Sequence, residues 1–174
     1  MSALYTYSDP KLHDKEVQTL QNAIAALSWV QDAYPLVRKG QDDKGNTFPQ
    51  VYKNDGTDVS VKVTPDSDVN CLCFFELDGN VERFPEGVGK YTYPLSVTFW
   101  LQLDKVYPAK NYDYTSELIV EIVNLLITYG CENISYTTED IFDGFSELED
   151  INTKFMRTYS AFKIFFSKEG TQCN

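Results

Sequence analysis

The segment from Leu95 to Leu103 carries the clearest pattern in the chain. Its odd-numbered positions are all apolar, and its even-numbered positions are polar except for Trp100. Alternation of this kind predicts a β-strand with one face on a hydrophobic core and the other towards solvent or a neighbouring layer. We therefore expect Val97, Phe99 and Leu101 inside the core, and Trp100 on the opposite face.

A helix is predicted shortly after this strand. Asp113 precedes residues 114–129, where apolar side chains recur every three or four positions, as in an amphipathic helix. The apolar stripe consists of Leu118, Ile122, Leu125, Leu126 and Tyr129. Gly130 is a favourable residue just beyond a helix end. We expect Ile122 and Leu126 to pack against the apolar face of the strand.

A first helix and several shorter strands are predicted around these two elements. Asp9 and Pro10 suit the cap and the first position of a helix that continues to about residue 28. Because Pro49 cannot donate a backbone hydrogen bond, its strand is expected at a sheet edge. Strands are expected at 36–37, 48–52, 59–63, 69–77, 81–84, 93–106, 131–137 and 159–167, with a hairpin turn at 78–80.

The order of these elements contains no repeated βαβ unit. It predicts an α+β fold: a mostly antiparallel mixed sheet with two main helices packed on it. A length of 174 residues fits a single domain over 1–174. Within it, an irregular acidic segment is predicted at about 138–154.

The charge of the chain restricts its partners. With 15 basic and 26 acidic residues, the formal net charge is −11. Proteins that bind nucleic acid or anionic membranes depend on basic groups, so neither is expected as a bound partner. The sequence has no apolar run long enough to span a membrane and no signal-peptide pattern at its start, which favours synthesis in a cytoplasm.

No catalytic, metal-binding or cofactor-binding set is predicted. Residues 40–47 have the glycine spacing of a phosphate-binding loop, but Asn46 stands where that loop needs lysine. The four cysteines lack the paired spacing of a zinc site. Cys71 and Cys73 fall in the apolar phase of their strand and are expected to be buried free thiols.

Aromatic residues suggest an interaction surface. Tyrosines cluster in the loops on both sides of the long strand, and tyrosine is favoured at protein interfaces. The predicted interface consists of Trp100, Tyr91, Tyr93, Tyr107, Tyr112 and Tyr114. Two alternatives compete with it: ordinary packing of the loops, and cover of Trp100 by the first helix or by residues 140–153 of the same subunit.

The order of elements resembles the tail-terminator and tail-completion (head–tail connector) proteins of tailed bacteriophages. The resemblance rests on the first helix with the Trp29 and Tyr34-Pro35 that follow it, the segment 48–52, the strand 95–103 with the helix 114–129, and the closing strand 159–166. It implies a non-catalytic virion protein, made in the host cytoplasm, that forms a ring, commonly hexameric, at the neck or tail end. Its partners would be further copies and neighbouring virion proteins, with DNA only as passing cargo. We hypothesise that a carboxylate-lined lumen repels phosphate and lets DNA slide.

Two other classes of function stay open at this point. One is a cytoplasmic adaptor or immunity-type binding protein, since such proteins are also acidic and aromatic. The other is a small metal-dependent enzyme that uses Asp66, Glu76 and Asp78, although Asp78 stands where a metal-dependent nuclease would carry lysine.

Overall fold

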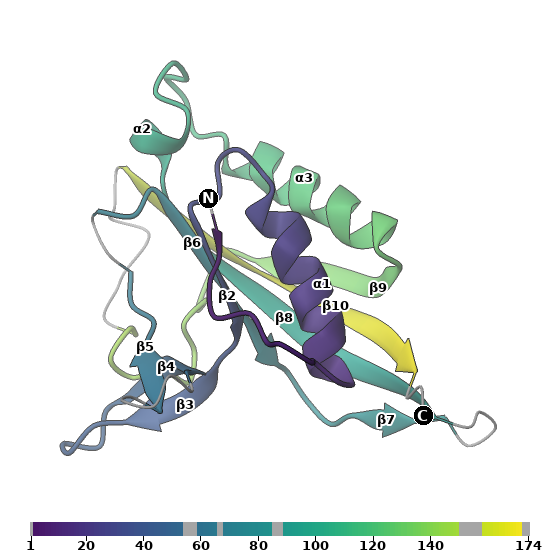
Figure 1. The fold of residues 1–174 in the computed structure, drawn as a ribbon. Coiled ribbons are helices and arrows are strands. Elements are labelled where there is room, and N and C mark those ends of the chain that lie inside the picture. Colours follow the sequence, from purple (N-terminus) through teal and green to yellow (C-terminus); the bar gives the residue numbers. More distant parts are fainter. Residues whose placement is uncertain (1, 54–58, 66–67, 85–88, 150–157, 172–174) are drawn as a thin grey trace.

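The structure is a computed structural model that describes residues 2–53, 59–65, 68–84, 89–149 and 158–171. Its main element is a seven-stranded mixed sheet (Figure 1). The strand order is β1 (Ser2–Ala3), β2 (Asp32–Leu36), β6 (Cys71–Leu77), β8 (Lys90–Gln102), β10 (Tyr159–Thr171) and β9 (Cys131–Thr137), and β7 (Glu82–Arg83) also pairs with β8. The first three strands in this order are parallel and the other pairs are antiparallel, so the predicted α+β fold is confirmed.

Two long strands form the frame of the sheet. β8 and β10 pair along all 13 of their residues, from Lys90 opposite Thr171 to Gln102 opposite Tyr159. On its other side, β8 pairs with β6. The strand predicted to reach Val106 ends at Gln102, because Leu103 starts the short helix α2 (Leu103–Val106) and donates its N–H to the carbonyl of Thr158.

Both longer helices cover the same face of this sheet (Figure 1). They are α1 (His13–Ala25) and α3 (Thr115–Thr128). The core between helices and sheet contains Val97, Phe99, Leu101, Ile122 and Leu126, all fully buried, which confirms the predicted packing.

The boundaries of α1 differ from the predicted ones at both ends, since it also ends at Ala25 and not at about residue 28. α1 begins at His13 rather than Pro10, and Leu12 precedes it with no side-chain cap. The side chain of Gln18 accepts a hydrogen bond from the Tyr7 N–H, so the preceding segment is held against the helix instead of continuing it. α3 ends just before Gly130, which has the positive φ of 71° expected of a residue after a helix.

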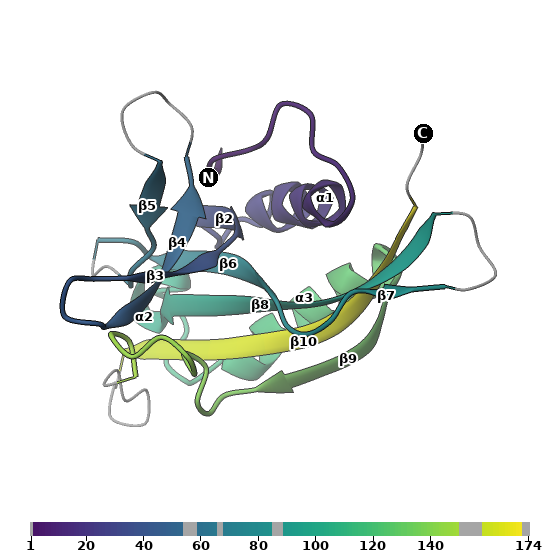
Figure 2. The ribbon, with the colours of Figure 1, turned by 90° about the horizontal axis from the view of Figure 1, so that it is seen from below.

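A second core lies on the opposite face of the large sheet. A three-stranded sheet covers part of this face, in the order β3 (Arg38–Gln41), β4 (Thr47–Tyr52) and β5 (Ser60–Lys62). It stands at the end of the large sheet remote from β7 (Figure 2). The buried residues of this second core are Val37, Val51, Val63, Leu72, Phe74, Trp100, Ile141, Phe142, Phe145, Leu148 and Ala161.

The acidic segment contributes to this second core. As predicted, its described part, residues 138–149, is irregular and forms successive turns; residues 150–154 lie outside the described part. However, four of its apolar side chains are buried against the sheet. They cover Trp100, which is only 3% exposed, with its ring centroid 6.0 Å from that of Phe142 and 5.1 Å from that of Tyr159. The expectation that a single subunit exposes the Trp100 indole is therefore wrong.

Two further strand predictions are corrected. β4 is the central strand of its sheet, not an edge strand. The Pro49 carbonyl accepts a hydrogen bond from the Val63 N–H, just beyond the end of β5. The N–H that Pro49 lacks therefore falls at the position where the hydrogen bonds between β4 and β5 end. Residues 78–80 do not form a hairpin between β6 and β7, since both strands pair with successive parts of β8.

Candidate interaction surface

The helix α3 carries apolar residues on its exposed side as well as on its buried side. Its inner side carries Leu118, Ile122 and Leu126, which are buried in the core. On its outer side, Val120 and Ile127 are each 57% exposed. Glu117, Glu121, Asn124 and Thr128 are exposed on the same helix, so its outer side is mixed. The exposed Val120 and Ile127 make this outer side a candidate contact surface.

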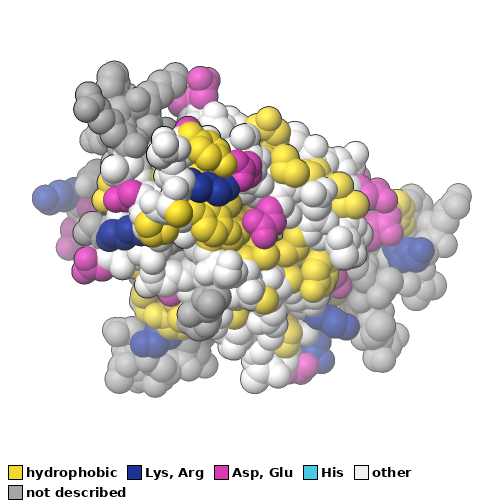
Figure 3. All heavy atoms as spheres, turned by 90° about the horizontal axis from the view of Figure 1, so that it is seen from above, with side chains coloured by type: hydrophobic (Ala, Val, Ile, Leu, Met, Phe, Trp, Pro, Cys, Tyr) yellow, Lys and Arg dark blue, Asp and Glu magenta, His cyan; other side chains and the backbone are white. Residues whose placement is uncertain are grey.

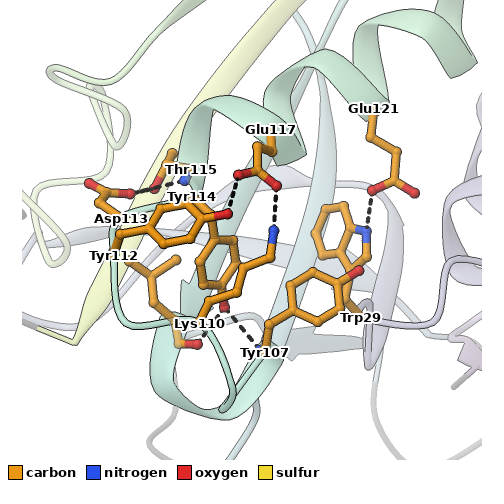
Figure 4. A network of polar contacts seen from close by, with 10 residues as sticks. Trp29, Tyr107, Lys110, Tyr112, Asp113, Tyr114, Thr115, Glu117 and Glu121 are labelled. Atoms are coloured by element: carbon orange, nitrogen blue, oxygen red, sulfur yellow. Dashed lines mark hydrogen bonds and ion pairs between the residues drawn. The ribbon is translucent and has the colours of Figure 1, made fainter.

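The only two charged residues of α3 are used within the subunit. Glu121 accepts a hydrogen bond of 2.9 Å from the Trp29 indole (Figure 4). Glu117 forms an ion pair with Lys110 and accepts a hydrogen bond of 2.7 Å from the Tyr112 hydroxyl. These donors, Lys110 first, lower the pKa of the Glu117 carboxyl.

Lys110 also organises the loop that precedes α3. Its ammonium nitrogen lies 4.9–5.5 Å from the ring centroids of Tyr107, Tyr112 and Tyr114, within the range of cation–π attraction. The Tyr107 N–H donates to the Tyr114 hydroxyl, which in turn donates to the Leu103 carbonyl. The hydrogen bond to Glu117 raises the pKa of Lys110. These contacts hold the loop against the first turns of α3 (Figure 4).

Only part of the predicted aromatic interface lies at this surface. The structure brings Tyr107, Tyr112 and Tyr114 together, but Tyr114 is buried and Tyr107 is half-buried. Tyr112 is 55% exposed. Trp100 lies in the second core, as described above.

The other two predicted tyrosines are at the opposite end of β8. Tyr91 and Tyr93 stack on each other with ring centroids 6.2 Å apart, and Tyr93 is buried beside His13. The six residues therefore do not form a single patch. An interface role for the exposed ones stays a prediction.

A broad groove adjoins the loop. Its volume is about 940 Å³, and it lies between residues 110–116 and the end of β9. Tyr112 and the 60% exposed Tyr136 line it. In its floor, the hydroxyls of Thr115 and Ser160 are 2.7 Å apart. Figure 3, which looks onto the side where α2 and α3 lie in Figure 1, shows hydrophobic side chains gathered among basic and acidic ones.

Val120, Ile127 and Tyr136 are exposed residues that were not predicted as part of an interface. A signal for the first two was present, because α3 has apolar residues at adjacent positions, 118–120 and 125–127, outside a single stripe. For Tyr136 there was no comparable signal. Its exposure depends on β9 being the last strand of the sheet.

A lysine side chain lies between two of the carboxylates that were considered as an alternative metal site, Glu76 and Asp78. The ammonium of Lys163 on β10 lies 2.8 Å from a Glu76 carboxylate oxygen and 3.8 Å from one of Asp78. Asp66 is outside the described residues. Within the described part of the chain, no group of three or more histidine, cysteine or acidic side chains is arranged to hold a metal ion.

The cysteines of the described segments are buried free thiols, as predicted for Cys71 and Cys73. Burial raises the pKa of both thiols, and that of Cys131 to about 11. Cys173 lies outside the described residues. Thiols that hold their protons this firmly are poor nucleophiles at neutral pH.

Comparison of the chain with models of protein families, with curated proteins and with solved structures finds no match. No helix among the described residues is long and apolar enough to cross a membrane.

Proposed function

We propose that this protein is a non-catalytic structural subunit that assembles with further copies of itself through α3 and the loop before it. The observation that carries the proposal is the exposure of Val120 and Ile127 on the outer side of α3, where Glu117 and Glu121 are bound within the subunit. Exposed apolar side chains that gather on one element favour a partner surface.

The kind of assembly we propose is a ring at the neck or tail end of a tailed-phage virion, as a tail terminator or head–tail connector. The order of elements that suggested this class is supported by the α+β fold. The net charge of −11 suits a ring through which DNA passes without binding. Neighbouring virion proteins would contact the ring from either side.

The test is the mass of the purified protein by light scattering, together with negative-stain microscopy for the ring. The variant Val120→Ser/Ile127→Ser should shift the particle towards monomers while the subunit stays folded. Val59→Ser is the matched control, since Val59 is 71% exposed on another part of the chain and its loss should leave the mass unchanged.

A wild-type protein that stays monomeric at high concentration would contradict self-assembly and favour the adaptor or immunity-type reading. An assembly that survives the double substitution would contradict the role of α3.

A further inference from the structure

The strand β9 forms a free edge of the large sheet. It pairs with β10 on one side, and no other strand of the described residues pairs with its other side. Residues 135–137 pair regularly with β10, beyond the register shift that follows Glu132. Residues 134–137 include no charged residue and no proline. An edge without these blocking residues leaves its backbone N–H and C=O groups able to pair with a further strand.

Apolar side chains of α3 are aligned on one side of the helix. Val120, Val123 and Ile127 recur at intervals of three and four residues, so they form a single stripe. Val120 and Ile127 are each 57% exposed, and Val123 is half-buried. The exposed residues Ser116 and Asn124 on the same side are uncharged. The stripe is therefore a neutral surface on a chain with a net charge of −11.

This stripe lies on the side of α3 that is nearer to β9. The helix lies between α1 and β9 in both views (Figures 1 and 2). Glu121, on the other side of α3, is bonded to Trp29, which follows α1. Ile119, next to the stripe, lines the same groove as Tyr136 of β9. The stripe and the free edge of the sheet thus face outwards together.

The acidic residues at the two ends of β9 do not belong to this surface. Glu132 lines a separate groove together with Pro94 and Ser167, on the face of the sheet away from the helices. Glu139 follows the strand and has an interaction within its own subunit. Two copies can therefore meet at residues 134–137 and the stripe without placing these carboxylates at the centre of the contact. Over most of their surface, two chains of equal negative charge repel each other.

We propose that β9 pairs in an antiparallel manner with β9 of a second copy, about a two-fold axis perpendicular to the sheet. This inference rests on the proposed self-assembly and names its contact. Such an axis joins the two large sheets into one and keeps both α3 helices on the same face of it, with their stripes towards each other. One operation thus pairs the free backbone groups and covers Val120 and Ile127. The contact is isologous, so a ring that contains it has an even number of copies.

Charge substitutions near the axis test this symmetry. Tyr136 is 60% exposed and lies within the paired stretch, so it meets the same region of the other copy. Tyr136→Lys and Tyr136→Glu should each weaken assembly roughly ten- to hundredfold in dissociation constant, because two like charges then meet. Mixing the two variants should restore assembly, since lysine then meets glutamate. In a contact between two different surfaces, mixing restores nothing.

The matched controls are Tyr52→Lys and Tyr52→Glu. They make the same changes at a tyrosine that is 45% exposed at the end of β4. Both should assemble like the wild type, and thermal melting should confirm that all variants fold.

Hydrogen exchange tests the backbone pairing separately. Amides within residues 134–137 should exchange more slowly in the assembled wild type than in Tyr136→Lys. Amides of β3, which is an edge strand of the smaller sheet, should exchange equally in both.

The outcomes separate the two proposals. A monomeric wild-type protein overturns the proposed function together with the inference. If the wild type assembles, the inference alone is overturned when Tyr136→Lys assembles equally well, or when mixing restores nothing. The same holds if the Tyr52 variants fail as badly as the Tyr136 variants, or if exchange at residues 134–137 does not differ between wild type and Tyr136→Lys.

Discussion

Lys163 on β10 and Glu76 on β6 form an ion pair across the strand that separates them. The nitrogen–oxygen distance is 2.8 Å, and Thr98 of the intervening β8 donates a hydrogen bond of 3.4 Å to the same carboxylate oxygen. The side chains of Lys163 and Glu76 are 9% and 15% exposed. The pair lies where the second face of the sheet changes from apolar to polar.

Breaking this pair should be costly. Lys163→Met leaves the Glu76 carboxylate buried and without its main partner, so we expect a loss of about 3–5 kcal/mol in the free energy of unfolding, measured with urea. The double variant Glu76→Leu/Lys163→Met should lose less than the single one, because no uncompensated charge stays buried.

The exposed ion pair between Lys62 and Glu147 provides the control. Lys62→Met should cost less than about 1 kcal/mol, as is usual for pairs in contact with water. Equal losses in Lys62→Met and Lys163→Met would contradict the burial of the Lys163 pair.

The free energy of unfolding should depend on pH through the protonation of the Glu76 carboxyl. Burial raises the pKa of its carboxyl above the ordinary 4.5, and this effect outweighs the attraction of Lys163, which lowers it. The folded protein therefore holds this proton more firmly than the unfolded chain does. The resulting stabilisation is complete below the unfolded pKa and is lost as the pH rises through the folded pKa.

Glu76→Gln should remove this contribution, so the difference in unfolding free energy between wild type and variant should fall as the pH rises from about 4.5. Glu117→Gln is the control of opposite sign, since hydrogen bonds from Lys110 and Tyr112 lower the pKa of that carboxyl. Its contribution should be present above the ordinary pKa and lost as the pH falls through the folded pKa. If the difference in unfolding free energy between wild type and variant changes with pH in the same direction for Glu76→Gln and Glu117→Gln, the opposite pKa shifts assigned to these two carboxyls are contradicted.

The central core should be sensitive to truncation. Phe99 is fully buried, with its ring centroid 4.8 Å from that of Phe162 and 5.7 Å from that of Trp29. Phe99→Ala should lower the free energy of unfolding by about 3–5 kcal/mol. A loss below about 1 kcal/mol, typical of surface positions such as Val59, would contradict its place in the core.

The sequence predicted the first core because its pattern is periodic. The alternation in β8 and the stripe in α3 each identify a face, and the two faces meet as expected at Phe99 and Ile122. Most of the strands were also predicted to within a few residues.

The second core was not predictable from periodicity. It joins Trp100 to Phe142 and Phe145, which come from an irregular segment without a regular spacing. In such a segment, acidic residues dominate the composition while a few aromatic ones determine the packing. Because β6 is buried on both faces, it is apolar on both, and its sequence does not distinguish the face on the first core from the face on the second.

The interaction surface was predicted only in part for a related reason. Tyrosines near one strand in the sequence lie at its two ends in the structure, so Tyr91 and Tyr112 are far apart along β8 and its following loop. The groove arises because β9, β10 and α3 converge, and these pairings are set by long-range contacts that local spacing does not encode.

The two tryptophans should respond differently to replacement by phenylalanine. Trp29 donates its indole N–H to Glu121 at 2.9 Å. The indole nitrogen of Trp100 is buried without a hydrogen-bond partner among the described residues. Trp29→Phe loses a hydrogen bond to a charged group, worth about 1.5–3 kcal/mol, whereas Trp100→Phe removes a buried donor that has no partner. Urea unfolding of both variants should therefore show the larger loss for Trp29→Phe.

Trp100→Ala completes this comparison, because it tests the position of Trp100 directly. Removal of the whole ring should cost about 3–5 kcal/mol, as expected in a packed core. The mass by light scattering, taken where the variant is still folded, should equal that of the wild type, since the ring faces Phe142 and Tyr159 of its own subunit. Loss of assembly at unchanged stability would instead place Trp100 at a contact between copies.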